Sequence, residues 1–147
     1  MNRPGTSPQD AHAIVVHGLQ HALAALRAGL PVTLLSAPGA GAFAGIGWWR
    51  ALIAAAMAAH PDALCSDILD CADAPGAVMA ALRHGQRRLI LSTDCPAFAA
   101  VAAAAGACGA ELLAVRPAAL DLAQPGAEGL LNAYLSHEDV RTRPGPP

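Results

Sequence analysis

The chain has 147 residues, of which 54% are hydrophobic and only 3% aromatic, and a formal net charge of −2 at neutral pH. This length suits a single domain with one hydrophobic core. All nine basic residues are arginines that form no basic stripe, so the composition argues against nucleic-acid binding, and the absence of lysine excludes a P-loop.

The N-terminal segment is predicted to be a helix. Ser7 and Pro8 suit the start of a helix, and apolar residues then recur with helical spacing until Gly29 and Pro31 end it. The alternative is a strand at residues 13–16, because a short apolar run does not by itself distinguish a strand from a helix.

Strands and helices then alternate along the chain. Four strands are predicted, at residues 32–37, 64–71, 88–92 and 111–115. Helices are predicted at residues 45–60, 75–84, 96–105 and 127–136. The strands are short and mostly apolar without alternation, as in sheets that are covered on both faces. Such alternation is typical of right-handed βαβ units and a parallel sheet.

We therefore expect an α/β fold, a three-layer Rossmann-like sandwich with a four-stranded, mostly parallel sheet and an N-terminal helix. The expected spatial order, with the strands numbered along the chain, is 2-1-3-4. One alternative is a half-barrel segment of βα repeats that dimerises. The single domain is expected to cover residues 1–136, and the Pro- and Gly-containing tail 137–147 is expected to be disordered.

The candidate site lies at the carboxyl ends of the predicted strands, where open parallel sheets bind their ligands. The candidate ligand-binding residues are Ser36, Gly39, Gly41, Gly45, Asp70, Asp73, Thr93, Asp94 and Arg116. For Asp73 and Asp94 the favoured interpretation is the cap of the helix that follows, because each stands two residues before a proline. Asp70 ends a buried strand and precedes the next helix by several residues, so a ligand-facing role and a structural role are equally favoured.

The glycines form the one local motif that suggests a mechanism, although they are common in a chain so rich in small residues. The spacing of Gly39, Gly41 and Gly45 resembles a relaxed dinucleotide fingerprint, in which glycines let the backbone approach a phosphate. The resemblance implies that Asp70 would meet a ribose. Pro38 and the bulky Phe43 depart from that pattern, and the chain supplies only one mononucleotide-sized half.

Three neighbouring aromatic residues suggest an interface. Phe43, Trp48 and Trp49 are three of only five aromatic residues, and adjacent helical positions such as Trp48 and Trp49 cannot face the same core. We therefore consider these residues as candidate contacts in a homo-oligomer. The alternative is one core tryptophan and one surface tryptophan.

No metal site is predicted. Asp67 and Asp70 lie three residues apart in a predicted strand and would face opposite sides of the sheet. The four cysteines form no CxxC pair. No cofactor can be identified from the sequence.

The location is expected to be cytoplasmic, without a membrane partner. The apolar stretch 31–60 carries Arg50 near its middle, beside two tryptophans, which is unlike a spanning helix. The first ten residues lack the apolar core of a signal peptide.

Three classes of function remain. The main prediction is a binding module for a small molecule that carries a phosphate or carboxylate group. The alternative is an oligomeric assembly or regulatory protein without small-molecule chemistry. A weaker alternative is a small enzyme that uses Asp70 or Asp94 as acid–base and Cys95 as a nucleophile.

Overall fold

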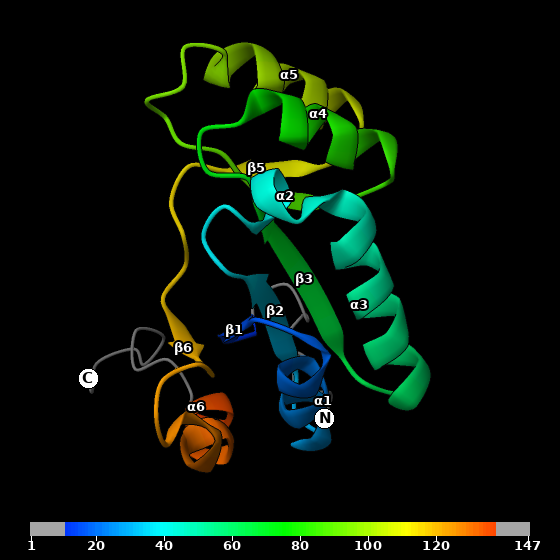
Figure 1. Ribbon diagram of the computed structural model, residues 1–147, viewed down its shortest axis with the longest axis vertical. Coiled ribbons are helices and arrows are strands. Elements are labelled where there is room, and N and C mark those ends of the chain that lie inside the picture. The colour runs from blue at the N-terminus through cyan, green and yellow to red at the C-terminus, as the bar shows by residue number, and fades with distance from the viewer. Residues whose placement is uncertain (1–10, 138–147) are drawn as a thin grey trace, which may run out of the picture.

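The computed structural model describes residues 11–137, which fold into a parallel sheet with flanking helices, consistent with a Rossmann-like fold (Figure 1). The strands are β1 (Ala13–Val16), β2 (Val32–Ser36), β3 (Cys65–Asp70), β4 (Arg88–Ile90), β5 (Glu111–Leu113) and β6 (Ala119–Asp121). The helices are α1 (Leu19–Arg27), α2 (Ala40–Phe43), α3 (Gly45–Ala59), α4 (Pro75–Arg83), α5 (Phe98–Ala107), the 3-10 helix η2 (Ala127–Leu130) and α6 (Leu131–Ser136). The prediction of a parallel α/β fold is confirmed.

The number and order of strands differ from the prediction. Residues 11–137 form a six-stranded sheet rather than a four-stranded one, in the order β5-β4-β3-β2-β1-β6, and every neighbouring pair is parallel. The predicted order, in which β2 lies between β3 and β4, is wrong. In the structure β3 lies in the middle and pairs directly with β2 on one side and with β4 on the other. From β1 to β5 the chain therefore adds each strand on the same side of the one before.

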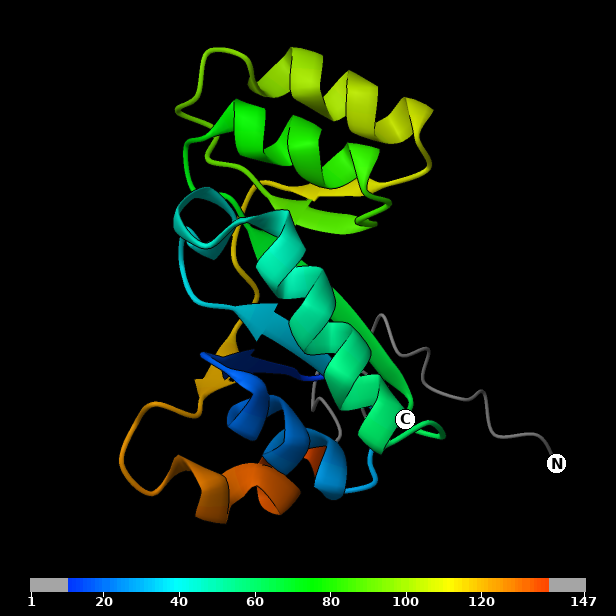
Figure 2. The same cartoon turned by 45° about the vertical axis from the view of Figure 1, so that its right-hand side comes forward.

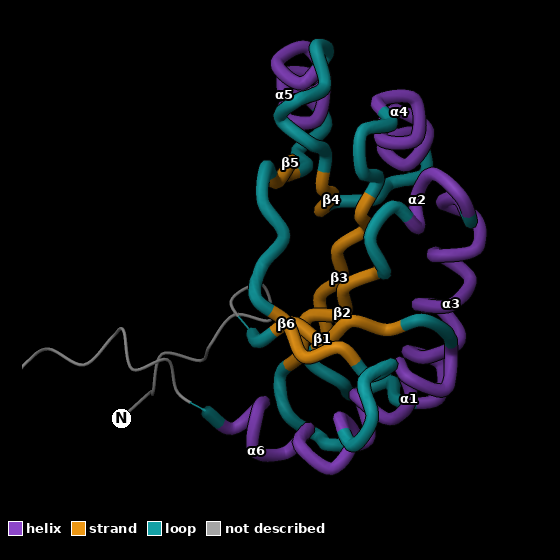
Figure 3. The backbone as a smooth tube through the Cα atoms, turned by 60° about the vertical axis from the view of Figure 1, so that its left-hand side comes forward, coloured by secondary structure: helices purple, strands orange, loops and turns teal. Residues whose placement is uncertain are grey.

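This winding places the helices on one face of the sheet. Right-handed connections that always advance in one direction put their helices on the same side. The larger core cluster joins residues of α1, α3, α4, α5 and α6 to one face of the sheet. The buried members of the smaller cluster, on the other face, are all strand residues: Ala13, Val15, Leu35, Ile68 and Ile90. Within the described residues the arrangement thus has two layers, not the three expected, and Figure 3 shows the helices in an arc along one side of the strands.

The first described strand corrects the prediction for the N-terminus. Residues 13–16, the alternative strand, form β1, while the predicted helix begins only at Leu19. The reason is the position of β1 between β2 and β6, where all four side chains of the strand are buried. A strand covered on both faces has no polar alternation to reveal it. The predicted helix start at Ser7 lies outside the described residues.

The second missed strand, β6, follows a connection without a helix. Residues 114–118 leave β5 at one edge of the sheet and cross the face opposite the helices to reach β6 beside β1, as Figure 3 shows. β6 has three half-buried residues and too little apolar pattern to be recognised in the sequence. The predicted last helix is confirmed as η2 followed by α6, and of the predicted tail only His137 is described.

Helix α3 is the longest of the described helices and packs against α1 and β3. Figure 2 shows it lying along β3, and its buried residues are Trp49, Leu52, Ile53 and Ala56. Among residues 11–137, no helix combines the length and the apolar character that crossing a bilayer requires.

The short helix α2 packs unusually close to the end of β3. A Cβ atom added at Gly41 would lie 2.6 Å from the Sγ atom of Cys71 and 3.1 Å from the carbonyl oxygen of Asp70. The site is therefore too small for any side chain. In a fingerprint of the kind expected here, one glycine serves this close packing of helix on strand.

We predict that Gly41→Ala lowers the free energy of unfolding by about 1–3 kcal/mol, because the buried Cys71 and the β3 backbone must shift. Gly47→Ala is the matched control, since a Cβ atom there would meet nothing within 4 Å. This control should be neutral or stabilising by up to about 1 kcal/mol, as expected for Gly→Ala in a helix. Urea unfolding followed by circular dichroism measures the free energy of unfolding of both variants. Equal changes in the two would contradict the close packing of α2 on the end of β3.

Candidate functional site

The candidate site begins with a hydrogen bond that joins the ends of two neighbouring strands. Ser36 ends β2 and Asp70 ends β3, and the hydroxyl of buried Ser36 accepts a hydrogen bond from the amide of Asp70 at 2.9 Å. The same hydroxyl donates to the carbonyl of Ala37 at 3.0 Å. The bond therefore fixes where the two loops leave the sheet.

The carboxylate of Asp70 holds both of these loops. Its Oδ1 atom accepts from the amide of Gly39 at 3.2 Å and from the amide of Ala72 at 2.7 Å. Ala72 has a positive φ of 51°, a conformation that side chains disfavour, and the short bond to Asp70 helps to hold it. Because Asp70 is only 3% exposed, these contacts replace water around its charge.

The other oxygen of Asp70 pairs with Arg116. The Nη1 atom of Arg116 donates to Oδ2 of Asp70 at 2.6 Å, and Nη2 donates to the carbonyl of Ser36 at 3.1 Å. Arg116 lies in the 114–118 connection, so the pair also anchors this segment to the central strands. The structure thus brings four of the predicted site residues together: Ser36, Gly39, Asp70 and Arg116.

These contacts change the interpretation of the glycine turn. Gly39 and Gly45 have φ values of 74° and 88°, which glycine adopts without cost. The amide of Gly39, expected to face a ligand anion, instead donates to the chain's own Asp70. That amide is therefore not available to a phosphate, and Gly41 serves packing. Gly45 makes the bend between α2 and α3, with open space beside its Cα atom.

The remaining predicted residues lie at the same edge without joining this cluster. Asp73, Thr93 and Asp94 are exposed. The loop that carries Thr93 is held beside the loop after β3, because the amide of Ser92 donates to the carbonyl of Ala72 at 2.7 Å. The favoured prediction for Asp73 and Asp94, a role as helix caps, is wrong: the cap positions are Ala74 and Ala97, and neither helix has a side-chain cap.

The aromatic residues divide between core and surface. Trp49 is fully buried, and its Nε1 atom donates to Oδ2 of Asp67 at 2.7 Å, so the assignment of Trp49 to an interface is wrong. Asp67 thus faces α3 while Asp70 faces Arg116, as expected for residues on opposite sides of a strand. Phe43 is 73% exposed and Trp48 is half-buried, and for these two an assembly role stays a prediction.

The cysteines give no support to thiol chemistry at this site. Burial, and secondly the charge of Asp70, raise the pKa of the Cys71 thiol to about 12. Burial and the charge of Asp67 raise the pKa of Cys65 to about 12 as well, against a backbone hydrogen bond that lowers it. Cys95, the candidate nucleophile of the weaker enzyme alternative, is buried and Cys108 is exposed. Protonated, buried thiols are poor nucleophiles.

Sequence reasoning missed a second polar cluster at the same edge. His17 follows β1 and Asp121 ends β6, and the Nε2 atom of His17 lies 2.7 Å from Oδ1 of Asp121. His17 and His21 are visible in the sequence as a pair four residues apart, but the predicted N-terminal helix contains both. Without β1 and β6 in the predicted sheet, nothing placed Asp121 beside them.

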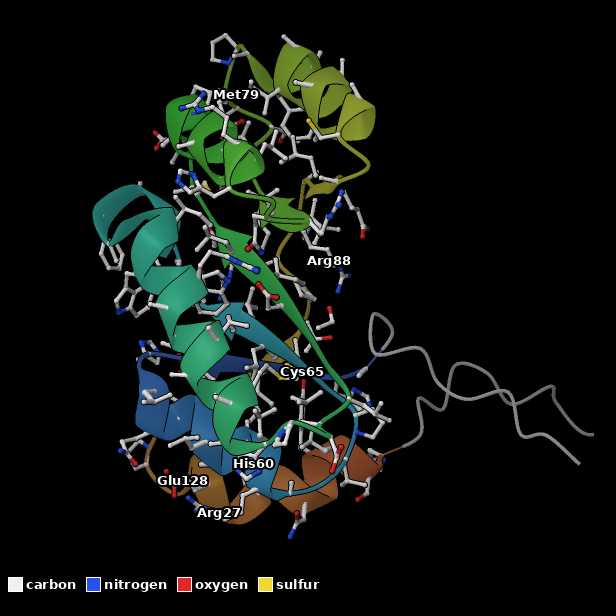
Figure 4. All side chains as sticks on the ribbon, turned by 90° about the vertical axis from the view of Figure 1, so that its right-hand side faces the viewer. Arg27, His60, Cys65, Met79, Arg88 and Glu128 are labelled. Carbon is white, nitrogen blue, oxygen red and sulfur yellow. The ribbon has the colours of Figure 1, made fainter. Side chains whose placement is uncertain are left out.

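Two surface grooves lie away from these clusters. One, of about 320 Å³, runs between α1 and α6, with Arg27 and Glu128 on its walls (Figure 4). The other, of about 440 Å³, lies at the opposite edge of the sheet and includes His60 and Leu64. In the part of the chain from 11 to 137, no three His, Cys, Asp or Glu side chains are grouped so that they could hold a metal ion. No family model matches the chain, and no curated protein matches it in sequence.

We predict that Arg116→Met lowers the free energy of unfolding by about 2–4 kcal/mol, because it leaves the buried Asp70 carboxylate without its cation. The loss should be smaller than for a fully buried pair, since the Arg116 side chain is 28% exposed.

A double-mutant cycle tests the cause of that loss. Asp70→Asn keeps an oxygen for the amides of Gly39 and Ala72 but removes the charge, so the double variant Asp70→Asn/Arg116→Met should be more stable than Arg116→Met alone. Denaturant unfolding measures all four proteins. Strictly additive effects would show that the pair is not coupled.

We also predict that thiol reagents distinguish the cysteines of the native protein. At pH 8 the exposed Cys108 should react at once, and the half-buried Cys65 should react more slowly because its raised pKa keeps it protonated. Cys71 should react only after denaturation, because its raised pKa keeps it protonated and burial keeps reagent out. Peptide mapping after timed alkylation identifies each residue. Early labelling of Cys71 would overturn the assignment of that thiol as inert.

Proposed function

We propose that this protein binds a small molecule carrying a phosphate or carboxylate group at the carboxyl ends of β2, β3 and β4, with Arg116 as the cation. The proposal rests on the unused hydrogen-bond donors and the partial exposure of the Arg116 guanidinium. Of its five N–H donors, two are bonded within residues 11–137, and the side chain is partly exposed. A fixed guanidinium with spare donors suits an oxyanion.

Asp70 is a positioning residue in this proposal. Its carboxylate is buried and fully engaged, so it orients the guanidinium and the two loops rather than touching the ligand. It also neutralises much of the positive charge, and we therefore expect modest affinity. Thr93 and Asp94 are exposed on the neighbouring loop, and we expect them to contact the neutral part of the ligand.

The location supports the same class of function. In open α/β sheets, ligands occupy the crevice beyond the carboxyl ends of the parallel strands. All strands here run in one direction, so the loops after β2, β3 and β4 share one edge. We assign no reaction to this site, because its titratable groups are either engaged in structure or fully solvated.

The test is a binding screen with matched neutral compounds. Orthophosphate, ribose 5-phosphate, AMP, succinate and citrate are compared with ribose and adenosine by thermal shift at constant ionic strength, and hits are measured by calorimetry. We expect at least one anion to raise the melting temperature while its neutral counterpart does not. Failure of every anion would end the proposal.

Two variants connect a hit to Arg116. Arg116→Lys keeps a cation beside Asp70 but loses the planar fork, and should weaken binding about tenfold or more, the value of one charge-assisted hydrogen bond. Arg88→Lys is the control, because Arg88 bonds Glu111 and Ser66, each at 3.1 Å, and lies at the start of β4 away from the proposed site. Equal losses in both variants would contradict a role for Arg116.

A further inference from the structure

A second cluster of reactive side chains lies where the direction of strand addition reverses. β1 lies between β2 and β6 and pairs with both in parallel, with Val15 opposite Asp121. The chain places His17 one residue after β1, and His21 in the first turns of α1. Figure 1 shows β1 and β6 as neighbours, so the two strands deliver these polar residues to the same edge.

The contacts within this cluster fix the orientation of His17. Its Nε2 atom lies 2.7 Å from Oδ1 of Asp121, and its backbone amide donates to Nδ1 of His21 at 3.2 Å. The two imidazole rings pack edge to face, with centroids 5.6 Å apart at 89°. A histidine held by a carboxylate through one nitrogen keeps its proton there and leaves a lone pair on the other.

Asp121 is suited to this orienting role. Burial favours a higher pKa for Asp121, but the amide of Ala123 at 2.9 Å and the neighbouring His17 and His21 outweigh it, so its pKa lies below the usual value. The carboxylate is therefore ionised throughout the neutral range. It attracts the Nε2 proton of His17 and would stabilise an imidazolium.

The free nitrogen of His17 faces no competing partner. Within the described residues its Nδ1 atom makes no hydrogen bond, and the side chain is 36% exposed. The space beside the next residue is also open, since a Cβ atom at Gly18 would meet nothing within 4 Å. No hydroxyl or thiol of residues 11–137 is hydrogen-bonded to His17 for it to activate, so the group of this cluster with the character of a nucleophile is the imidazole itself.

We propose that His17, oriented by Asp121, is a phosphoryl acceptor that forms a phosphohistidine at Nδ1. The phosphoryl donor is a small acyl phosphate or a phosphoramidate. The Nδ1 lone pair forms the N–P bond while the bond from phosphorus to the leaving oxygen or nitrogen breaks. The leaving group departs with that electron pair, as a carboxylate or, after taking a proton from water, as ammonia. The Nε2 proton stays shared with Asp121, and the unbonded Nε2–H of His21 is available to a phosphoryl oxygen.

This inference does not depend on ligand binding at Arg116. It concerns His17 and Asp121, and it is tested by covalent phosphorylation rather than by reversible binding. The full chain is incubated separately with phosphoramidate and with acetyl phosphate at neutral pH. Intact mass spectrometry counts the added phosphoryl groups, and peptide mapping under alkaline conditions locates them. We expect one group per chain on His17, lost in acid and stable in base, and formed faster than on N-acetylhistidine.

Three variants test the roles of the residues. His17→Gln should abolish the modification, and Asp121→Asn should slow it by about tenfold or more, because the imidazole loses its orienting base. His84→Gln is the matched control, since His84 is an exposed histidine whose Nδ1 atom bonds the carbonyl of Ala80 at 2.9 Å, and it should leave the rate unchanged.

The proposal fails under any of three results. Labelling that persists in His17→Gln would show another acceptor. A wild-type rate no greater than that of N-acetylhistidine would show no activation. A rate unaffected by Asp121→Asn in a folded variant, as judged by circular dichroism, would remove the orienting pair. The comparison with N-acetylhistidine uses the wild-type protein alone and therefore holds even if a variant does not fold.

Discussion

The carboxylate of Asp70 is the contact on which the geometry of the carboxyl edge depends. It binds the amides of the loops after β2 and β3 with one oxygen and the guanidinium of Arg116 with the other. A buried charge requires this full set of partners, because any lost partner leaves it uncompensated in a poorly solvated place. One side chain thereby fixes three segments that are far apart in the sequence.

Arg116 also stabilises the fold, because it anchors a connection that crosses the sheet without a helix. Strands β1 to β5 are added in one direction, so their helices share one face, and the opposite face is crossed by the helix-free connection 114–118. A connection without a helix brings little apolar surface of its own. The ion pair to Asp70 supplies an anchor where other α/β proteins have a packed helix.

The same winding explains why the carboxyl edge carries two polar clusters. The cluster around Asp70 uses the ends of β2 and β3, which follow each other in the chain. The cluster of His17, His21 and Asp121 uses β1 and β6, whose residues meet only because the chain returns across the sheet. In a parallel sheet every strand delivers its last side chains to one edge, so distant segments can supply reactive groups to neighbouring positions.

The parallel α/β class, most of the strands and helices, and the convergence of Ser36, Asp70 and Arg116 were predictable from the sequence, because these features follow from local apolar patterns and from strands that share a direction. Tertiary structure decided the strand order, the single helical face, the burial of Trp49 and the use of the Gly39 amide by Asp70. Those features depend on which segments meet across the sheet. Strands of only three or four residues, such as β1 and β6, carry no local signal of their neighbours, because the pairing itself is what stabilises them.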